Sequence, residues 1–151
     1  CVQPFDITVP DPSFGSLVLK TVPSEGIDLS EAKVLVAAGR GVGEEENLDF
    51  VQQLAAQFSQ AATCGSRPII DAGWVPYSRQ VGITGATVAP ALYIACGISG
   101  AAQHVSGMRG AGFVVSINSD PGAAIFNASD ICIVEDLTAF IPLLIEQIST
   151  S

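Results

Sequence analysis

The sequence predicts an α/β fold in which a parallel β-sheet is covered by helices on both faces. Its candidate strands are short runs that are apolar throughout, such as VLVAA at 34–38 and LYIAC at 92–96. Helix-length segments separate these runs, and strands without polar alternation are typical of sheets buried on both sides. Hydrophobic residues make up 48% of the chain and charged residues 14%, where about 25% charged is usual. We therefore expect one three-layer domain, which suits a length of 151 residues.

The expected elements follow in order along the chain. Residues 1–33 are punctuated by Pro and Asp and contain the extended candidates FDITV and LVLKTV, so we expect a linker or edge strands there and the domain itself over 34–151. Strands are expected at 34–38, 67–70 (RPII), 92–96, 113–117 (FVVSI) and 131–135 (ICIVE). Helices are expected over 44–62 and from about 100 to 107. A last helix is expected to begin between 139 and 141, which keeps Pro142 in its first turn.

Charge and composition exclude several classes of function. The net charge of −9 argues against binding to nucleic acid and to anionic membrane surfaces. No apolar run approaches the roughly 20 residues that span a bilayer, so membrane insertion is not expected. The four cysteines form no C-x-x-C pair and there is one histidine, so no zinc site is evident. Cys96 and Cys132 lie in apolar runs and are expected to be buried thiols of a reduced compartment. The chain starts at Cys1, which indicates a fragment.

Glycines and small polar residues follow the expected strands. The sequence reads GRGVG after residue 38, GISG after residue 96 and NSDPGA after FVVSI. In parallel sheets, ligands bind beyond the carboxyl ends of the strands, so we expect the site at this edge. GRGVG is no dinucleotide fingerprint, because Glu44 occupies the last glycine position, and Arg40 either reaches a ligand or is exposed on a turn. Ser99 and Gly100 precede a helix without a nearby acid, which suits either a phosphate or an ordinary serine cap.

Single residues leave alternatives open. His104, the only histidine, is by itself more often a satisfied core or surface group than a ligand, and no nucleophile set accompanies it. An arginine at a strand start, such as Arg67, is most often solvated, and Asp120 and Asp136 are by themselves more often turn or cap residues than ligands. The uncharged stretch VGITGATVAP at 81–90 places the Thr84 hydroxyl between two glycines, so that backbone and one small donor can approach a flat ligand. Together, many glycines, several donors and few charges favour a large, partly apolar cofactor with a phosphate arm.

Five linked motifs between 34 and 144 resemble one family. GRG, GSRPIIDAGWVP, RQVGITG with LYIACGISGAAQHVSGM, the IN-DP run at 117–121 and the D-CIV-DL run at 130–137 resemble, in order, the C-terminal FAD-binding domain of the electron transfer flavoprotein alpha subunit. The resemblance implies a Rossmann-like fold of the DHS-like NAD/FAD-binding type. It implies FAD as cofactor and an electron carrier rather than an enzyme with its own substrate. It also implies a beta subunit, a flavoprotein dehydrogenase and an electron acceptor as partners, in the bacterial cytoplasm or the mitochondrial matrix.

The resemblance also implies which residues bind the cofactor. Arg67 is expected beside the flavin ring, Thr84 as the donor to flavin N5 and His104 at the N1/O2 edge. The helix start at Ser99 and Gly100 is expected to handle phosphates, and Asn118, Asp120, Asp136 and Leu137 are expected near the adenosine end. The full expected set is Arg40, Ser66, Arg67, Gln80, Val81, Gly82, Thr84, Gly85, Ser99, Gly100, Gln103, His104, Asn118, Asp120, Asp136 and Leu137.

Two departures and two alternatives accompany the resemblance. Ile83 stands where the family has glutamine, and Ala86 where it usually has lysine, which is expected to weaken FAD binding or to mark a divergent subfamily. The family's alpha subunit has an N-terminal domain that pairs with the beta subunit, and this sequence lacks it. One alternative is the NAD- or ADP-binding domain of a thiamine- or NAD-dependent enzyme. The other is an assembly module that kept the fold and lost its ligand.

Overall fold

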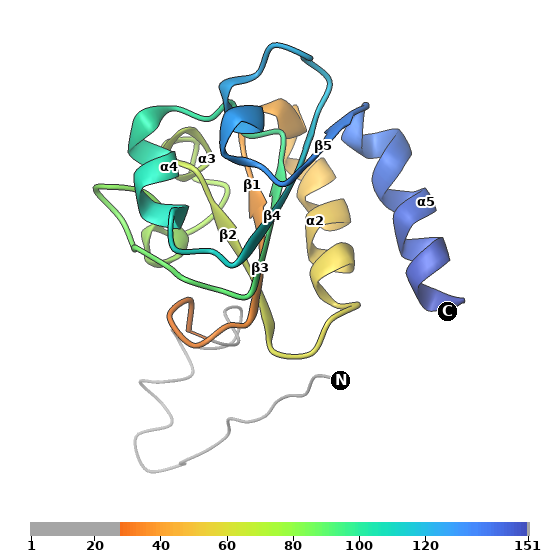
Figure 1. Cartoon of the computed structure of the whole chain (residues 1–151), viewed down its shortest axis with the longest axis horizontal. Helices are drawn as coiled ribbons and strands as arrows, with labels where there is room; N and C mark the ends of the chain where they lie inside the picture. Colours follow the sequence, from red (N-terminus) through yellow and green to blue (C-terminus); the bar gives the residue numbers. More distant parts are fainter. Residues whose placement is uncertain (1–27, 151) are drawn as a thin grey trace.

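A five-stranded sheet forms the centre of the molecule (Figure 1). The computed structural model describes residues 28–150. All strand pairs are parallel, in the order β2-β1-β3-β4-β5. The strands are β1 (Val34–Ala38), β2 (Ala61–Gly65), β3 (Leu92–Cys96), β4 (Phe113–Asn118) and β5 (Ile131–Val134). The order reverses between β1 and β3, and in open α/β sheets such a switch point is where ligands bind.

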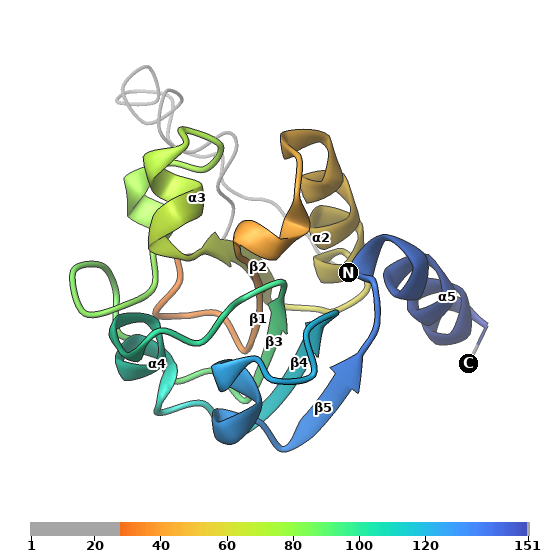
Figure 2. The same cartoon turned by 90° about the horizontal axis from the view of Figure 1, so that it is seen from above.

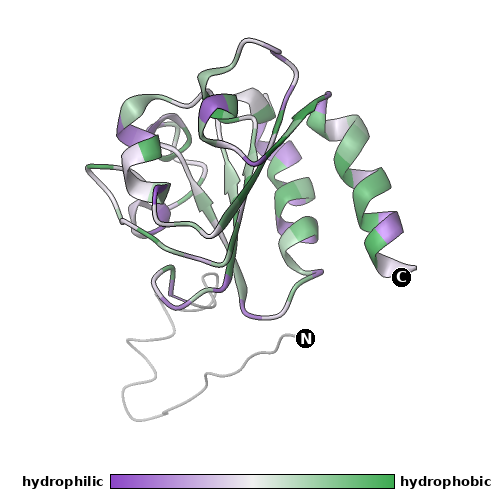
Figure 3. Ribbon diagram, in the orientation of Figure 1, coloured by the Kyte–Doolittle hydropathy of each residue, from purple (hydrophilic) through white to green (hydrophobic). Residues whose placement is uncertain are grey.

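Helices cover both faces of the sheet, which confirms the predicted three layers. Helices α2 (Leu48–Ala55) and α5 (Leu137–Ser149) pack with Val36, Ile94 and Ile117 on one face. The other face packs Leu35, Tyr93 and Val114 against α4 (Ala102–Met108) and the 3-10 turn η5 (Ala124–Ala128). Figure 2 shows these two layers on opposite sides of the strands. Because successive strand residues point to opposite faces and helices cover both faces, most strand residues are apolar, as Figure 3 shows.

The expectation of a strand at 67–70 is wrong. These residues belong to the short helix α3 (Arg67–Asp71), and Pro68 lies in its first turn, where a missing N–H removes no hydrogen bond. The second strand is instead β2. Its first two residues belong to the stretch 44–62 that was expected to be one helix, and the other three follow it. The helical part of that stretch comprises the 3-10 turn η3 (Glu45–Asn47) and α2. Ser66 and Arg67 therefore follow the carboxyl end of a strand.

The last helix begins earlier than predicted. Asp136 is its N-cap and its carboxylate accepts a hydrogen bond from the Thr138 N–H at 2.8 Å, so the helix starts at Leu137 rather than between 139 and 141. Pro142 consequently lies inside the helix, beyond its first turn. A side-chain cap stabilises the first turn strongly enough to set the start upstream of the proline.

The remaining expectations on the fold concern the N-terminal segment, the cysteines and the absence of a membrane-spanning helix. FDITV and LVLKTV lie outside the described residues, whereas Leu29 and Ala32 are buried in the core with the α4 face. Cys96 is buried as expected, and burial raises the pKa of its thiol to about 12. Cys132 is exposed, contrary to prediction, because β5 is the edge strand. Over residues 28–150, none of the helices is both long and apolar enough to cross a membrane.

Candidate functional site

The turns after β1 and β3 lie in direct backbone contact at the switch point. Gly39 N–H donates to the Cys96 carbonyl at 2.9 Å, and Gly41 N–H to the Gly97 carbonyl at 2.8 Å. A Cβ on Gly39 would lie 2.5 Å from the Gly97 oxygen, so a side chain there would separate the two turns. Gly39 and Gly41 thus serve this close approach, and Arg40, in the 3-10 turn η2 (Arg40–Val42), projects from the joined turns.

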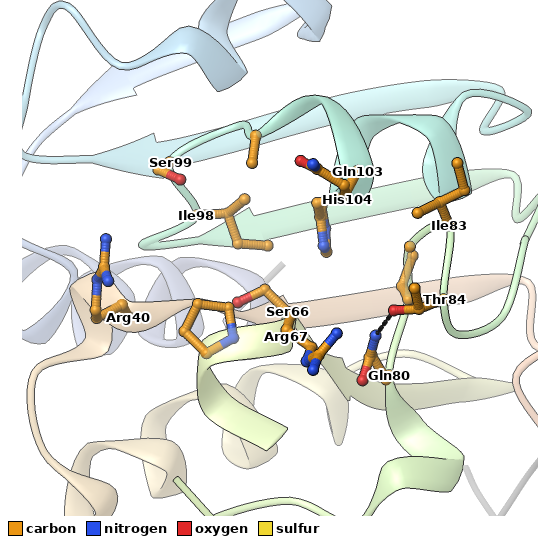
Figure 4. A pocket seen from close by; sticks show the side chains of 14 residues that line it. Arg40, Ser66, Arg67, Gln80, Ile83, Thr84, Ile98, Ser99, Gln103 and His104 are labelled. Atoms are coloured by element: carbon orange, nitrogen blue, oxygen red, sulfur yellow. Dashed lines mark hydrogen bonds between the residues drawn. The ribbon is translucent and has the colours of Figure 1, made fainter. Parts of the chain in front are cut away.

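A cavity of about 270 Å³ opens beside these turns (Figure 4). Its lining comes from the ends of β1, β2 and β3, the loop at 80–84 and the first turn of α4. The lining residues that the sequence had predicted are Arg40, Ser66, Arg67, Gln80, Val81, Gly82, Thr84, Ser99, Gln103 and His104. The fold therefore brings most of the predicted set into one cavity.

A second hollow of about 480 Å³ continues along the same edge. It shares Arg40, Ser99 and Ala101 with the first cavity. Its other predicted residues are Gly100, Asn118 and Asp120. The two hollows thus form one elongated site that runs from the 80–84 loop to the end of β4.

Hydrogen bonds hold the polar residues of the second hollow in place. Asn118 donates from its amide to the Ile98 carbonyl at 3.0 Å and accepts from the Asp120 N–H at 2.9 Å. The Asp120 carboxylate accepts from the Gly122 N–H at 2.9 Å. These bonds make Asn118 and Asp120 turn-forming residues, whose remaining polar surface lines the hollow.

Three predicted residues line neither hollow. Asp136 caps α5, and its hydrogen bonds with Thr138 lower the pKa of its carboxyl. Leu137 is the first residue of α5 and is buried in the core on that face of the sheet. Gly85 lies behind the 80–84 loop, where an added Cβ would be 2.4 Å from the Gln80 oxygen, so its missing side chain makes room for the chain's own backbone. Their contact with a cofactor stays a prediction.

The Thr84 hydroxyl is oriented by its neighbour. Gln80 is buried, and its amide donates to Thr84 Oγ1 at 2.7 Å (Figure 4). Because the oxygen already accepts this bond, the hydroxyl hydrogen is directed elsewhere as a donor. The Tyr77 hydroxyl donates to the Thr84 carbonyl, and Ile83 N–H to the Gln103 carbonyl at 2.8 Å, so both sides of the loop are fixed.

His104 is buried on the inner wall of the cavity. Its ring Nε2 lies 2.8 Å from the Tyr93 hydroxyl, while Nδ1 is buried and makes no hydrogen bond with any of the residues that the structure describes. Burial lowers the pKa of the imidazole to about 4, and the Val81 backbone offsets only part of this effect. The ring is therefore neutral near pH 7, so it can act at this wall as a hydrogen-bond donor or acceptor but not as a cation.

The sequence matches the profile of the electron transfer flavoprotein FAD-binding domain over residues 28–109, more than half of the chain. The chain belongs to this flavoprotein family. Its cofactor is FAD.

Curated relatives agree with this assignment. The electron transfer flavoprotein subunit alpha of Bacillus subtilis is 49% identical over 82% of the chain and 38% of its own length. Protein FixB of Clostridium saccharobutylicum is 40% identical over 97% of the chain and 44% of its own length. The lactate dehydrogenase (NAD(+),ferredoxin) subunit LctC of Acetobacterium woodii is 44% identical over 87% of the chain and 31% of its own length. The chain thus spans less than half the length of each of these relatives. The alternative of an NAD- or ADP-binding enzyme domain is not favoured.

The residues of the flavoprotein site fit FAD. A dinucleotide is long, and the two adjoining hollows extend along the sheet edge past the glycine turns. The partnerless Nδ1 of His104 is a buried polar atom beside the first hollow, and natural structures rarely leave such atoms without a purpose. No side chain caps the start of α4, and no acid lies in its first turn, so Ser99 is not the ordinary cap that the sequence left open.

Positive charge at the flavoprotein site comes from two arginines. Arg67 is exposed, and its Nε donates to the Asp71 carboxylate at 3.0 Å, which leaves the terminal nitrogens for other contacts. Figure 4 shows Arg67 on α3 and His104 on α4 approaching the cavity from different sides. Arg40 contributes to both hollows.

Sequence reasoning missed the apolar part of the lining. Pro68, Ile98 and Ala101 complete the first hollow, and Gly41 and Gly122–Ala124 the second. Pro68, Ile98 and Gly41 are each directly next to a predicted polar residue, and the others lie within four residues of one, so closeness in sequence was the available signal. Ile83, noted as a departure from the family, is 65% exposed at the rim of the first hollow.

Proposed function

We propose that this chain carries electrons on FAD between partner proteins and transforms no substrate of its own. The observation that carries the proposal is the composition of the first hollow. It combines oriented neutral donors, the two exposed arginines Arg40 and Arg67, and no acid, which suits holding a redox cofactor in either oxidation state. When bound, FAD supplies the capacity to accept and release electrons, and the protein sets how readily it does so.

In this proposal the flavin ring of FAD lies in the first hollow and the adenosine end lies in the second. Thr84, Arg67 and His104 surround the flavin ring in the first hollow. Arg40 and Ser99 hold the phosphates where the hollows join, and Asn118 and Asp120 face the adenosine end. Ile83 would present a methyl-bearing chain at the rim where an amide is expected, which weakens hydrogen bonding there.

Partners and context follow from the same relatives. We propose a beta subunit as the stable partner, and a flavoprotein dehydrogenase and a separate acceptor as transient ones. Residues 1–33 would link the FAD-binding domain of 34–151 to further parts of the protein. The matched relatives are bacterial, which supports a cytoplasmic location. LctC belongs to a lactate dehydrogenase by its name, so an enzyme complex is the second setting in which such a domain would act.

Replacing Arg67 with alanine tests the carrier proposal. Removing a partly exposed cation beside the ring should disfavour the reduced, more negative cofactor by about 1 kcal/mol, or about 20 mV for two electrons. Reductive titration of the FAD-loaded chain would measure the midpoint potential.

Arg67→Lys is the matched control, since it keeps the charge and should retain most of the wild-type potential. A midpoint potential unchanged in Arg67→Ala would contradict the assigned role of Arg67. Turnover of an organic substrate by the loaded chain alone would contradict the carrier proposal itself.

A further inference from the structure

The buried pair of Tyr93 and His104 connects the core to the cavity. Tyr93 is on β3 with no exposed surface, and its hydroxyl lies 2.8 Å from His104 Nε2. Among residues 28–150, the one other hydrogen bond of that hydroxyl is a weak one from the Cys64 thiol, with the sulfur 4.0 Å from the oxygen. The rings meet edge to face, with centroids 6.1 Å apart.

The hydrogen of the Tyr93 hydroxyl has two candidate acceptors, His104 Nε2 and the Cys64 sulfur. The Tyr93 hydroxyl carries a single hydrogen, and burial keeps it protonated. An imidazole nitrogen at 2.8 Å is a much better acceptor than a thiol sulfur at 4.0 Å. If Nε2 carried a hydrogen and donated it to Tyr93, the tyrosine hydrogen would be left with the sulfur alone, and a poorly bonded buried donor is costly.

We propose that Tyr93 is a positioning residue that sets the tautomer of His104. Its hydroxyl donates to Nε2, so the neutral ring carries its hydrogen on Nδ1. Within residues 28–150 that nitrogen makes no hydrogen bond of ordinary geometry, although the Val81 backbone interacts with the ring. His104 then offers one N–H, held in orientation by the core, to an acceptor atom of the cofactor. Only this last step rests on the proposed function, because the tautomer is a property of the ligand-free chain.

The single histidine makes the proposal directly measurable. The chain has one histidine, so ¹⁵N-histidine labelling of the untagged protein gives one imidazole and two ring-nitrogen signals. Near neutral pH without FAD, we expect Nδ1 to show the signal of a protonated nitrogen and Nε2 that of an unprotonated one. The opposite assignment in the wild type would overturn the proposal without any variant.

Two variants separate positioning from packing. Tyr93→Phe keeps the ring and removes the hydroxyl, so the population with hydrogen on Nε2 should become the major one. Cys64→Ala removes the distant sulfur and should leave the tautomer unchanged. If Tyr93→Phe folds, as judged by its backbone amide spectrum, and keeps hydrogen on Nδ1 to the wild-type extent, the proposal fails.

The affinity of the chain for FAD is a second measurement, and its outcome tests a different step from the tautomer measurement. Loss of one oriented hydrogen bond in Tyr93→Phe should weaken FAD binding about tenfold. A changed tautomer with unchanged FAD affinity would overturn the step from His104 to the cofactor while leaving Tyr93 as the group that sets the tautomer. A chain that binds no FAD at all would overturn the proposed function and leave the tautomer result standing.

Discussion

Replacing Gly100 with alanine is expected to lower the free energy of unfolding by more than about 3 kcal/mol. Gly100 has φ of +98°, and an added Cβ would lie 2.1 Å from the Ile125 nitrogen and 2.5 Å from its Cα. Ile125 is fully buried, and its N–H donates to the Ser99 carbonyl at 2.9 Å. The loop after β3 would have to move away from η5 and lose this bond. Urea denaturation of the wild type and the variant measures the effect.

Gly73 provides the matched control. Its φ is +79°, yet an added Cβ would meet nothing within 4 Å. Gly73→Ala therefore isolates the cost of the left-handed backbone conformation, which is about 1 kcal/mol. If both variants lose the same stability, the close approach of the 97–100 turn to η5 is not what requires glycine at position 100. Gly100 also lines the second hollow, so its variant should lose FAD affinity as well.

Acid is expected to destabilise the chain through His104. The imidazole has a pKa of about 4 when folded and an ordinary value of 6.5 when unfolded. Between these pH values the unfolded chain binds more protons, so the free energy of unfolding falls as the pH falls from 6.5 to 4 and is fully retained above 6.5. The loss should reach about 3 kcal/mol. Chemical denaturation at several pH values without FAD measures it.

His104→Gln isolates this contribution. Glutamine does not titrate, so the variant should lose much less stability over the same range, whatever its stability at neutral pH. The lowered pKa values of Asp28 and Asp136 act below 3.8, outside that range, and are common to both proteins. Parallel pH profiles for the wild type and His104→Gln would show that the buried imidazole is already charged or accessible to solvent.

Apolar runs made most of the sheet predictable from the sequence. The runs at 34–38, 92–96 and 113–117 became strands inside the sheet between the helical layers, and the run at 131–135 became the exposed edge strand β5. β2 was missed because AATCG lacks the large β-branched and aromatic residues typical of strands. RPII has such residues, but Pro68 suits a helix start.

The sequence predicted which residues meet at the site, but it did not predict how their side chains contact one another. Glycines and donors after each strand indicated the edge, and linked motifs supplied the residues that meet there. The bond between Tyr93 and His104 depends on how α4 packs against β3, which periodicity does not specify. Gly85 was taken as making room for a ligand, whereas its missing Cβ makes room for the Gln80 backbone.

Titration of the purified 151-residue chain with FAD tests the central claim most directly. Heat release and the visible absorption of the flavin, followed together, would give stoichiometry and affinity, with FMN, ADP and NAD as comparison ligands. We expect one FAD per chain, bound more tightly than FMN or ADP because only FAD occupies both hollows. A chain that leaves the flavin spectrum unchanged, or that binds ADP or NAD as tightly as FAD, would contradict it.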